Sequence, residues 1–211
     1  MTEERKAWLE KRKNGIGGSE ASAVIGCNPY MTNVELWEIK TGRREQPDIS
    51  EKACVKYGTM AEAPLIELFA LDFPKYEVKH VDYDLRMHPD IPFLFVSLDG
   101  ALLDGNGRRG VLEVKTTNIL QSMQAEKWND RVPQNYFVQV LHSLLVTGYD
   151  FAVLKAQMKT EWNGEIQLKT RHYHFERQDF EADIQFLLDR EIVFWDHVKK
   201  DVCPPLVLPQ I

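Results

Sequence analysis

The feature that most constrains the fold is a predicted β-hairpin in the middle of the chain. Two apolar segments, residues 93–96 and 111–112, each lead into an acidic residue. Between them, residues 104–107 read Asp-Gly-Asn-Gly, a composition typical of tight turns. If the hairpin is symmetric about this turn, Asp99 and Glu113 face each other across the two strands, whereas a bulge would shift the register by one residue. The pattern predicts two buried strands that carry opposed carboxylates.

Opposed carboxylates in apolar surroundings repel each other and are costly to remove from water. A divalent cation between them offsets this cost, and oxygen ligands suit Mg²⁺ or Mn²⁺. Lys115, two residues after Glu113, lies on the same face of its strand. Asp, Glu and Lys in this order are the residues that metal-dependent phosphodiester hydrolysis requires. The alternative is that Asp99 lies in a turn and that Glu113 and Lys115 form a surface salt bridge.

Helices and strands alternate along the chain in an order that predicts an α/β (α+β mixed) fold, with a central mixed sheet flanked by helices. Apart from the hairpin, one strand is expected at residues 77–87 and a strand pair at 151–158 and 166–175. Helices are expected at residues 2–13 with Thr2 as cap, 19–25, from 32 or 33 to 41, 50–70, 133–148 and 178–199.

Length and composition agree with a single domain covering residues 1–211. The net charge is −6, which argues against non-specific coating of nucleic acid but allows a local basic groove. The three cysteines are too few and too far apart for a disulfide framework or a four-cysteine metal site, so we expect small apolar side chains in a reducing compartment. The charged N-terminus and the lack of a long apolar stretch predict a cytoplasmic protein without membrane association.

Two further positions are candidates for the same site. Glu62, near Gly58 on the helix before the sheet, could supply another carboxylate, or it could be a solvated helix residue. Gln139, on the helix that starts at Pro133, could hold Lys115 or a water molecule, or it could be a buried amide bonded to the backbone.

An anion site is suggested near the N-terminus. Gly17, Gly18 and Ser19 open a helix and offer backbone N–H groups and a hydroxyl, and Arg12 could add a charged fork. The alternative is an ordinary serine cap with Arg12 on a solvated face. His172 and His174 alternate on a strand, and we expect them on the sheet surface rather than in a metal site.

With these residues identified, the chain resembles the phage lambda exonuclease and YqaJ-type viral recombinase family of the PD-(D/E)xK nuclease superfamily. A departure is Leu98, where the superfamily signature usually has Pro. The similar segments are residues 15–22, 29–30, 35–37, 57–62, 97–100, 112–115 and 136–139.

The resemblance implies a PD-(D/E)xK restriction-endonuclease-like core at about residues 50–160 and a set of metal ligands. Asp99, Glu113 and the carbonyl of Val114 would hold the catalytic Mg²⁺, with Mn²⁺ as a substitute. Glu62 would help to bind a second ion. Lys115 would orient and help to deprotonate the attacking water.

The resemblance also implies the reaction and its partners. Gln139 would support Lys115, and Arg12 and Ser19 would bind the 5′-phosphate of the strand being digested. Family members are 5′→3′ exonucleases on linear double-stranded DNA that release mononucleotides and leave a 3′ overhang. They are often homotrimers and act with a single-strand annealing protein in phage or prophage recombination. A structure-selective endonuclease and a non-catalytic DNA-end-binding module are the alternatives.

Overall fold

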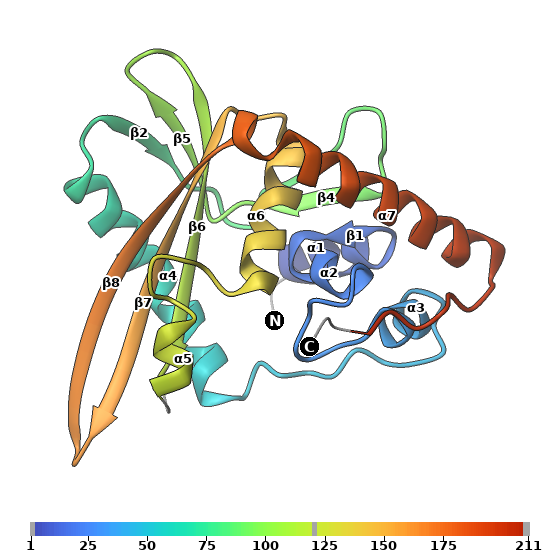
Figure 1. Cartoon of the computed structure of the whole chain (residues 1–211), viewed down its shortest axis with the longest axis horizontal. Helices are drawn as coiled ribbons and strands as arrows, with labels where there is room; N and C mark the ends of the chain where they lie inside the picture. The colour runs from blue at the N-terminus through green and yellow to red at the C-terminus, as the bar shows by residue number, and fades with distance from the viewer. Residues whose placement is uncertain (1–2, 120–121, 209–211) are drawn as a thin grey trace.

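The computed structural model describes residues 3–119 and 122–208, so the expected cap at Thr2 lies outside the described residues (Figure 1). The helices are α1 (Glu3–Lys13), α2 (Gly18–Val24), α3 (Asn33–Lys40), α4 (Ala53–Asp72), α5 (Ser122–Glu126), α6 (Gln134–Thr147) and α7 (Glu181–Lys200). The strands are β1 (Ile16–Gly17), β2 (Tyr76–Lys79), β3 (Leu85–Met87), β4 (Leu94–Ser97), β5 (Gly100–Asp104), β6 (Arg109–Asn118), β7 (Phe151–Trp162) and β8 (Glu165–Glu176). None of the helices in these two ranges is long and apolar enough to cross a membrane.

The larger sheet has five strands in the order β2-β5-β6-β7-β8 within the described residues. The β6–β7 pair is parallel and the other pairs are antiparallel, so the sheet is mixed, as expected. Alternate residues of β6 pack into two separate cores, because successive side chains point to opposite faces of a sheet. Leu112 and Val114 pack with Leu65 of α4, whereas Val111 packs with Leu141 of α6. Helices α4 and α6 therefore cover opposite faces.

The smaller sheet has the order β1-β4-β3 and lies beside α1, α2 and α6 (Figure 1). Strand β1 runs parallel to β4, and the Ile16 N–H donates to the Phe93 carbonyl at 2.7 Å. Just before β1, a Cβ at Gly15 would lie 2.2 Å from that carbonyl oxygen, so only glycine allows this approach. Close contact between Gly15 and Phe93 thus fixes α1 against the small sheet.

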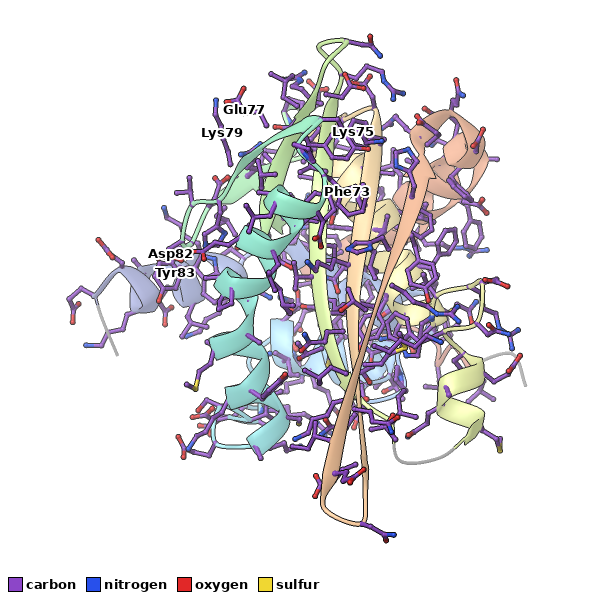
Figure 2. The ribbon with its side chains drawn as sticks, turned by 90° about the vertical axis from the view of Figure 1, so that its left-hand side faces the viewer. Phe73, Lys75, Glu77, Lys79, Asp82 and Tyr83 are labelled. Atoms are coloured by element: carbon purple, nitrogen blue, oxygen red, sulfur yellow. The ribbon has the colours of Figure 1, made fainter. Side chains whose placement is uncertain are left out.

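The prediction of a single strand at residues 77–87 was wrong, because this segment forms two strands that belong to different sheets. Strand β2 pairs with β5, and β3 pairs with β4. A turn closed by the Asp84 N–H and the Val81 carbonyl separates them, with Tyr83 at a φ of +59°. Figure 2 shows Glu77 and Lys79 at the outer edge of β2, where charged side chains discourage pairing with another chain.

A second correction concerns residues 93–96, expected to lead into the hairpin's first strand. They form β4 of the small sheet, and the hairpin strand is β5. The other predicted elements agree with expectation within a few residues, whereas β1 and α5 were not predicted. Thr32 is the cap of α3, and Gly148 ends α6 with a φ of +63°. Two of the cysteines, Cys54 and Cys203, are exposed rather than packed as small apolar residues.

Candidate active site

The β5–β6 hairpin places Asp99 opposite Glu113. Gly100 pairs with Leu112, so the next position in the same register joins Asp99 and Glu113. The Asp104 carboxylate accepts the N–H groups of Asn106 and Arg108, which fixes the turn without a shift of register. The predicted symmetric hairpin is therefore confirmed.

Glu113 is the most constrained polar residue of the site. Its side chain is 1% exposed, and Oε1 accepts Lys115 Nζ at 2.5 Å and Gln139 Nε2 at 2.6 Å. The Glu113–Lys115 ion pair of the alternative interpretation exists, but its Glu113 end is buried and the pair does not lie on the open surface. Glu113 Oε2 is buried and has no hydrogen-bond partner among the described residues. A buried carboxylate oxygen without a partner is costly, so this atom is suited to a ligand.

Asp99 lies where the chain passes from β4 to β5. Its Oδ2 accepts the Val114 N–H at 2.7 Å, and its backbone carbonyl contacts His80 Nδ1 at 2.5 Å. Burial raises the pKa of Asp99 to about 6, with Lys115 acting in the opposite direction. Burial also raises the pKa of Glu113 to about 7, against the effect of Lys115. Burial alone would lower the pKa of Lys115, but Glu113 and Asp99 outweigh it and raise the pKa.

These residues fit a hard divalent cation at Asp99 and Glu113. The donors are carboxylate oxygens, and the orphaned Glu113 Oε2 needs a positive partner. Across residues 3–119 and 122–208, no group of three or more His, Cys, Asp or Glu side chains is already gathered around a metal position. The metal ligands, including the carbonyl of Val114, and the number of ions therefore stay predictions.

Glu62 is brought to the edge of this site by α4. One turn before it, a Cβ at Gly58 would lie 3.1 Å from Thr116 Oγ1, so glycine permits the close approach of α4 to β6. Burial raises the pKa of the half-buried Glu62, while the charges of His80 and Lys115 lower it. Glu62 thus shares the electrostatic field of the site, although no hydrogen bond ties it to Asp99 or Glu113.

The Arg12 and Ser19 side chains meet, as expected for an anion pocket. Arg12 Nη2 donates to Ser19 Oγ at 3.3 Å, and the guanidinium lies 4.4 Å from the centre of the Trp8 ring. One detail of the prediction was wrong, because the Gly17 N–H is not free but donates to Glu20 Oε2. The alternative of a serine cap was wrong as well, because the cap of α2 is Gly17 and Ser19 lies inside the helix.

The Arg12–Ser19 pair adjoins the carboxylate site through α2 and α6. A Cβ at Gly18, the first residue of α2, would lie 3.3 Å from Gln139 Cγ. Gln139 in turn donates to Glu113. The structure therefore brings the sequence-predicted residues of α1, α2, β6 and α6 into one continuous region.

Sequence reasoning missed His80 and Trp8. His80 had no signal, because its contact with Asp99 depends on the pairing of β2 with β5. Trp8 could have been found from the sequence, because it lies four residues before Arg12 on a helix and therefore on the same face. Its indole Nε1 donates to Ser97 Oγ at 3.3 Å, which ties α1 to the end of β4.

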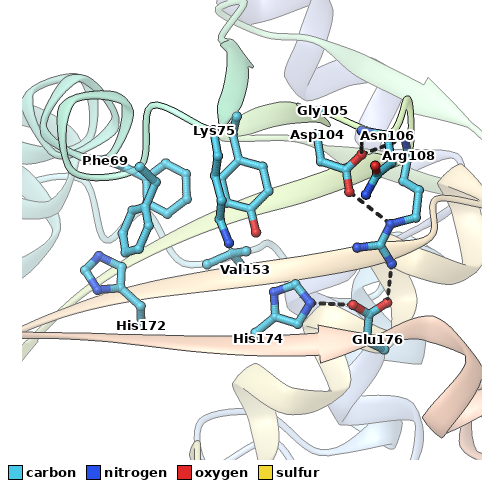
Figure 3. Close-up of a pocket in the computed structure, with 12 residues that line it drawn as sticks. Phe69, Lys75, Asp104, Gly105, Asn106, Arg108, Val153, His172, His174 and Glu176 are labelled. Atoms are coloured by element: carbon cyan, nitrogen blue, oxygen red, sulfur yellow. Dashed lines mark hydrogen bonds and ion pairs between the residues drawn. The ribbon is translucent and has the colours of Figure 1, made fainter.

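His172 and His174 lie on the exposed surface of β8, as predicted. They line a pocket of about 590 Å³ between the end of α4 and the hairpin turn (Figure 3). Within it, Arg108 is bonded to both Asp104 and Glu176. The charges of Arg108, Asp104 and Glu176 are therefore already paired with one another. The pocket is separate from the site of Asp99 and Glu113.

The raised carboxylate pKa values predict how metal binding depends on pH. A cation competes with protons for Asp99 and Glu113, so the Tm increase caused by Mg²⁺ should be small at pH 5.5 and grow as pH rises through about 6–7. In the metal-free chain the folded state binds more protons than the unfolded state between about pH 4 and 7, so stability should fall as pH rises across that window.

Thermal melts with EDTA or Mg²⁺ at several pH values test this expectation. Glu113→Gln should flatten the metal-free pH profile and remove most of the Mg²⁺ effect. Glu10→Gln, on the exposed face of α1, is the control and should preserve both. A Mg²⁺ effect that does not change between pH 5.5 and 8 would contradict the assignment.

Comparisons with known proteins identify the family and the fold of this chain. Residues 7–150 match the YqaJ-like viral recombinase domain. The chain is 32% identical over 198 residues to the uncharacterized protein YqaJ of Bacillus subtilis (strain 168), covering 91% of this chain and 56% of that protein. The chain thus spans little more than half the length of this relative.

Solved structures show the same fold at low identity. The alkaline exonuclease LHK-Exo of Laribacter hongkongensis aligns with a TM-score of 0.68 and 17% identity over 93% of both chains. Its complex with dAMP aligns with a TM-score of 0.65 and 16% identity over 93% of both chains. The domain match, which covers more than half of the sequence, shows that this chain belongs to the YqaJ-like viral recombinase family.

Proposed function

We propose that this chain is a Mg²⁺-dependent exonuclease that digests the 5′-ended strand of linear double-stranded DNA. The observation that carries the proposal is the unpartnered, buried Glu113 Oε2 beside Asp99 and Lys115. Two buried carboxylates are unfavourable, and the single charge of Lys115 offsets only one of them, so stability alone does not explain the pair. The fold shared with a protein named as an alkaline exonuclease supports the same reaction class.

The chain's own groups divide the work of such a reaction. A bound Mg²⁺ would supply a water molecule of lowered pKa and offset negative charge on the phosphate. Lys115, held by Glu113 on the same strand, would orient the attacking water and, as an ammonium, offset the negative charge that develops as the water loses its proton. Gln139 would keep Glu113 in place from α6.

Arg12 and Ser19 would define the end at which digestion starts. A guanidinium and a hydroxyl at hydrogen-bonding distance can both donate to a terminal 5′-phosphate. Because this pair adjoins Gln139 and hence Glu113, a bound 5′-end would lie next to the candidate catalytic residues. A homotrimer and a single-strand annealing partner remain predictions from the family resemblance.

Digestion of a blunt linear duplex with one 5′-phosphate and different labels at its two ends tests the function. Mg²⁺-dependent release of mononucleotides from the phosphorylated strand, with the other strand intact and no reaction in EDTA, is expected. Cleavage of a closed circle would instead assign the site to an endonuclease. Tight DNA binding without any cleavage would assign a binding module.

Arg12→Ala should reduce the preference for phosphorylated ends. Loss of a charge-assisted hydrogen bond to the phosphate is expected to lower the ratio of digestion rates, 5′-phosphate over 5′-hydroxyl, by about tenfold. Rates on the two substrates, compared with those of Lys13→Ala at the exposed end of α1, measure the effect. A ratio equal to that of the wild type would exclude Arg12 from end recognition.

A further inference from the structure

A buried ion pair lies directly beneath Arg12. Lys40 of α3 and Glu20 of α2 have side chains that are 2% and 7% exposed, and their Nζ and Oε2 atoms are 2.8 Å apart. Lys40 Nζ also contacts Glu20 Oε1 at 2.9 Å and the backbone carbonyl of Arg12 at 3.0 Å. The Lys40 ammonium therefore links α1, α2 and α3 at the residue expected to bind phosphate.

The charges of these three side chains influence each other. Burial lowers the pKa of Arg12, whereas Glu20 raises it, so the field of the Glu20 carboxylate reaches the guanidinium. Burial also lowers the pKa of Lys40, with Glu20 raising it and Arg12 lowering it further. Two cations and one carboxylate leave a single positive charge, and the cation that is hydrogen-bonded to an exposed hydroxyl is Arg12.

We propose that Lys40 is a positioning residue that sets the selectivity of the pocket for a terminal 5′-phosphate. It neutralises Glu20 and anchors the main chain of Arg12, so the charge of Arg12 is available to an incoming phosphate dianion. Without Lys40, the nearest countercharge for Arg12 is the buried Glu20 carboxylate, which competes with the phosphate. This inference rests on the part of the proposed function that assigns end recognition to Arg12.

The structure supplies variants that separate charge from packing. Lys40→Met keeps the length of the side chain but leaves Glu20 uncompensated. Lys40→Met combined with Glu20→Gln removes both charges together. Glu20→Gln alone retains an acceptor for Lys40 while removing the competing carboxylate. Lys155→Met is the matched control, because Lys155 is an equally buried lysine on β7 that lies near Asp72 and Phe69.

The measurement is the ratio of dissociation constants for 5′-hydroxyl and 5′-phosphate duplexes, obtained by fluorescence anisotropy in EDTA with each variant's folding checked by circular dichroism. Lys40→Met should lower the ratio roughly five- to tenfold, the effect of about one charge-assisted contact. The double variant should recover most of the loss. Glu20→Gln should equal or exceed the wild-type ratio, and Lys155→Met should preserve it.

Three results would overturn the inference: an unchanged ratio in Lys40→Met, a double variant no better than Lys40→Met, or a reduced ratio in Glu20→Gln. If Lys40→Met does not fold, the Glu20→Gln ratio decides. A wild-type ratio of one also refutes it, because no phosphate pocket then exists. Selective binding in EDTA without digestion in Mg²⁺ would refute the proposed exonuclease and leave the role of Lys40 supported.

Discussion

Replacing Asp99 with Asn is expected to lower the rate of Mg²⁺-dependent digestion by at least about 10³-fold, while duplex DNA still binds. Asn keeps the size of the side chain but removes the charge that opposes Glu113 and that a cation needs. The Val114 N–H retains an acceptor, because the amide oxygen can replace Oδ2. The hairpin should therefore remain folded, and only the chemistry should be lost.

Three measurements on Asp99→Asn test this expectation: the digestion rate, the affinity for duplex DNA in EDTA, and the Tm with and without Mg²⁺. The control is Asp90→Asn, an exposed position in the loop before β4. Full activity in Asp99→Asn would refute the site. Loss of DNA binding together with activity would mean that Asp99 supports the DNA-binding surface instead of the reaction.

Lys115→Met is expected to reduce the digestion rate by about 10²–10³-fold while preserving the Mg²⁺-induced increase in Tm. The lysine neutralises Glu113 at 2.5 Å and lies 5.5 Å from the centre of the Tyr136 ring. A metal ion can also neutralise Glu113, but the apolar Met side chain cannot orient a water molecule or offset developing negative charge. The variant should therefore lose digestion activity but keep the increase in Tm that Mg²⁺ causes.

The control for this variant is Lys155→Met, which removes a more deeply buried lysine from the opposite face of the sheet. It should digest DNA at nearly the wild-type rate. If Lys115→Met loses the Mg²⁺ effect on Tm as well, Lys115 organises the carboxylates and does not act on water.

The hairpin and its carboxylates could be predicted because the information is local. The Asp-Gly-Asn-Gly turn sets the register, and the period of two along β6 assigns Glu113 and Lys115 to one face. The division of residues 77–87 between two sheets could not be predicted, because it depends on pairing with strands later in the chain. The first half pairs with β5 and the second half with β4. Val78 and Leu85 gave an alternation that fits one strand or two.

The candidate site residues also differ in how far they could be predicted from the sequence. Arg12 and Ser19 are close in sequence and were recognised together, but Lys40 reaches them only through the packing of α3. His80 depends on β2 pairing at the sheet edge. The interpretation of Ser19 as a helix cap failed because the Glu20 side chain bonds to the Gly17 N–H and moves the start of α2.

The junction at Asp99 has a consequence for the size of the product. Arg12 is attached to the small sheet through Trp8 and Ser97, whereas Glu113 belongs to the large sheet. Asp99 follows Ser97 by two residues, where one sheet gives way to the other. On the proposed function, the span from the bound 5′-end to the bond that breaks is a fixed length built into this junction. The distance between Arg12 and the carboxylates would then set how many nucleotides are released at each cut, because only Leu98 separates Ser97 from Asp99 where the two sheets meet.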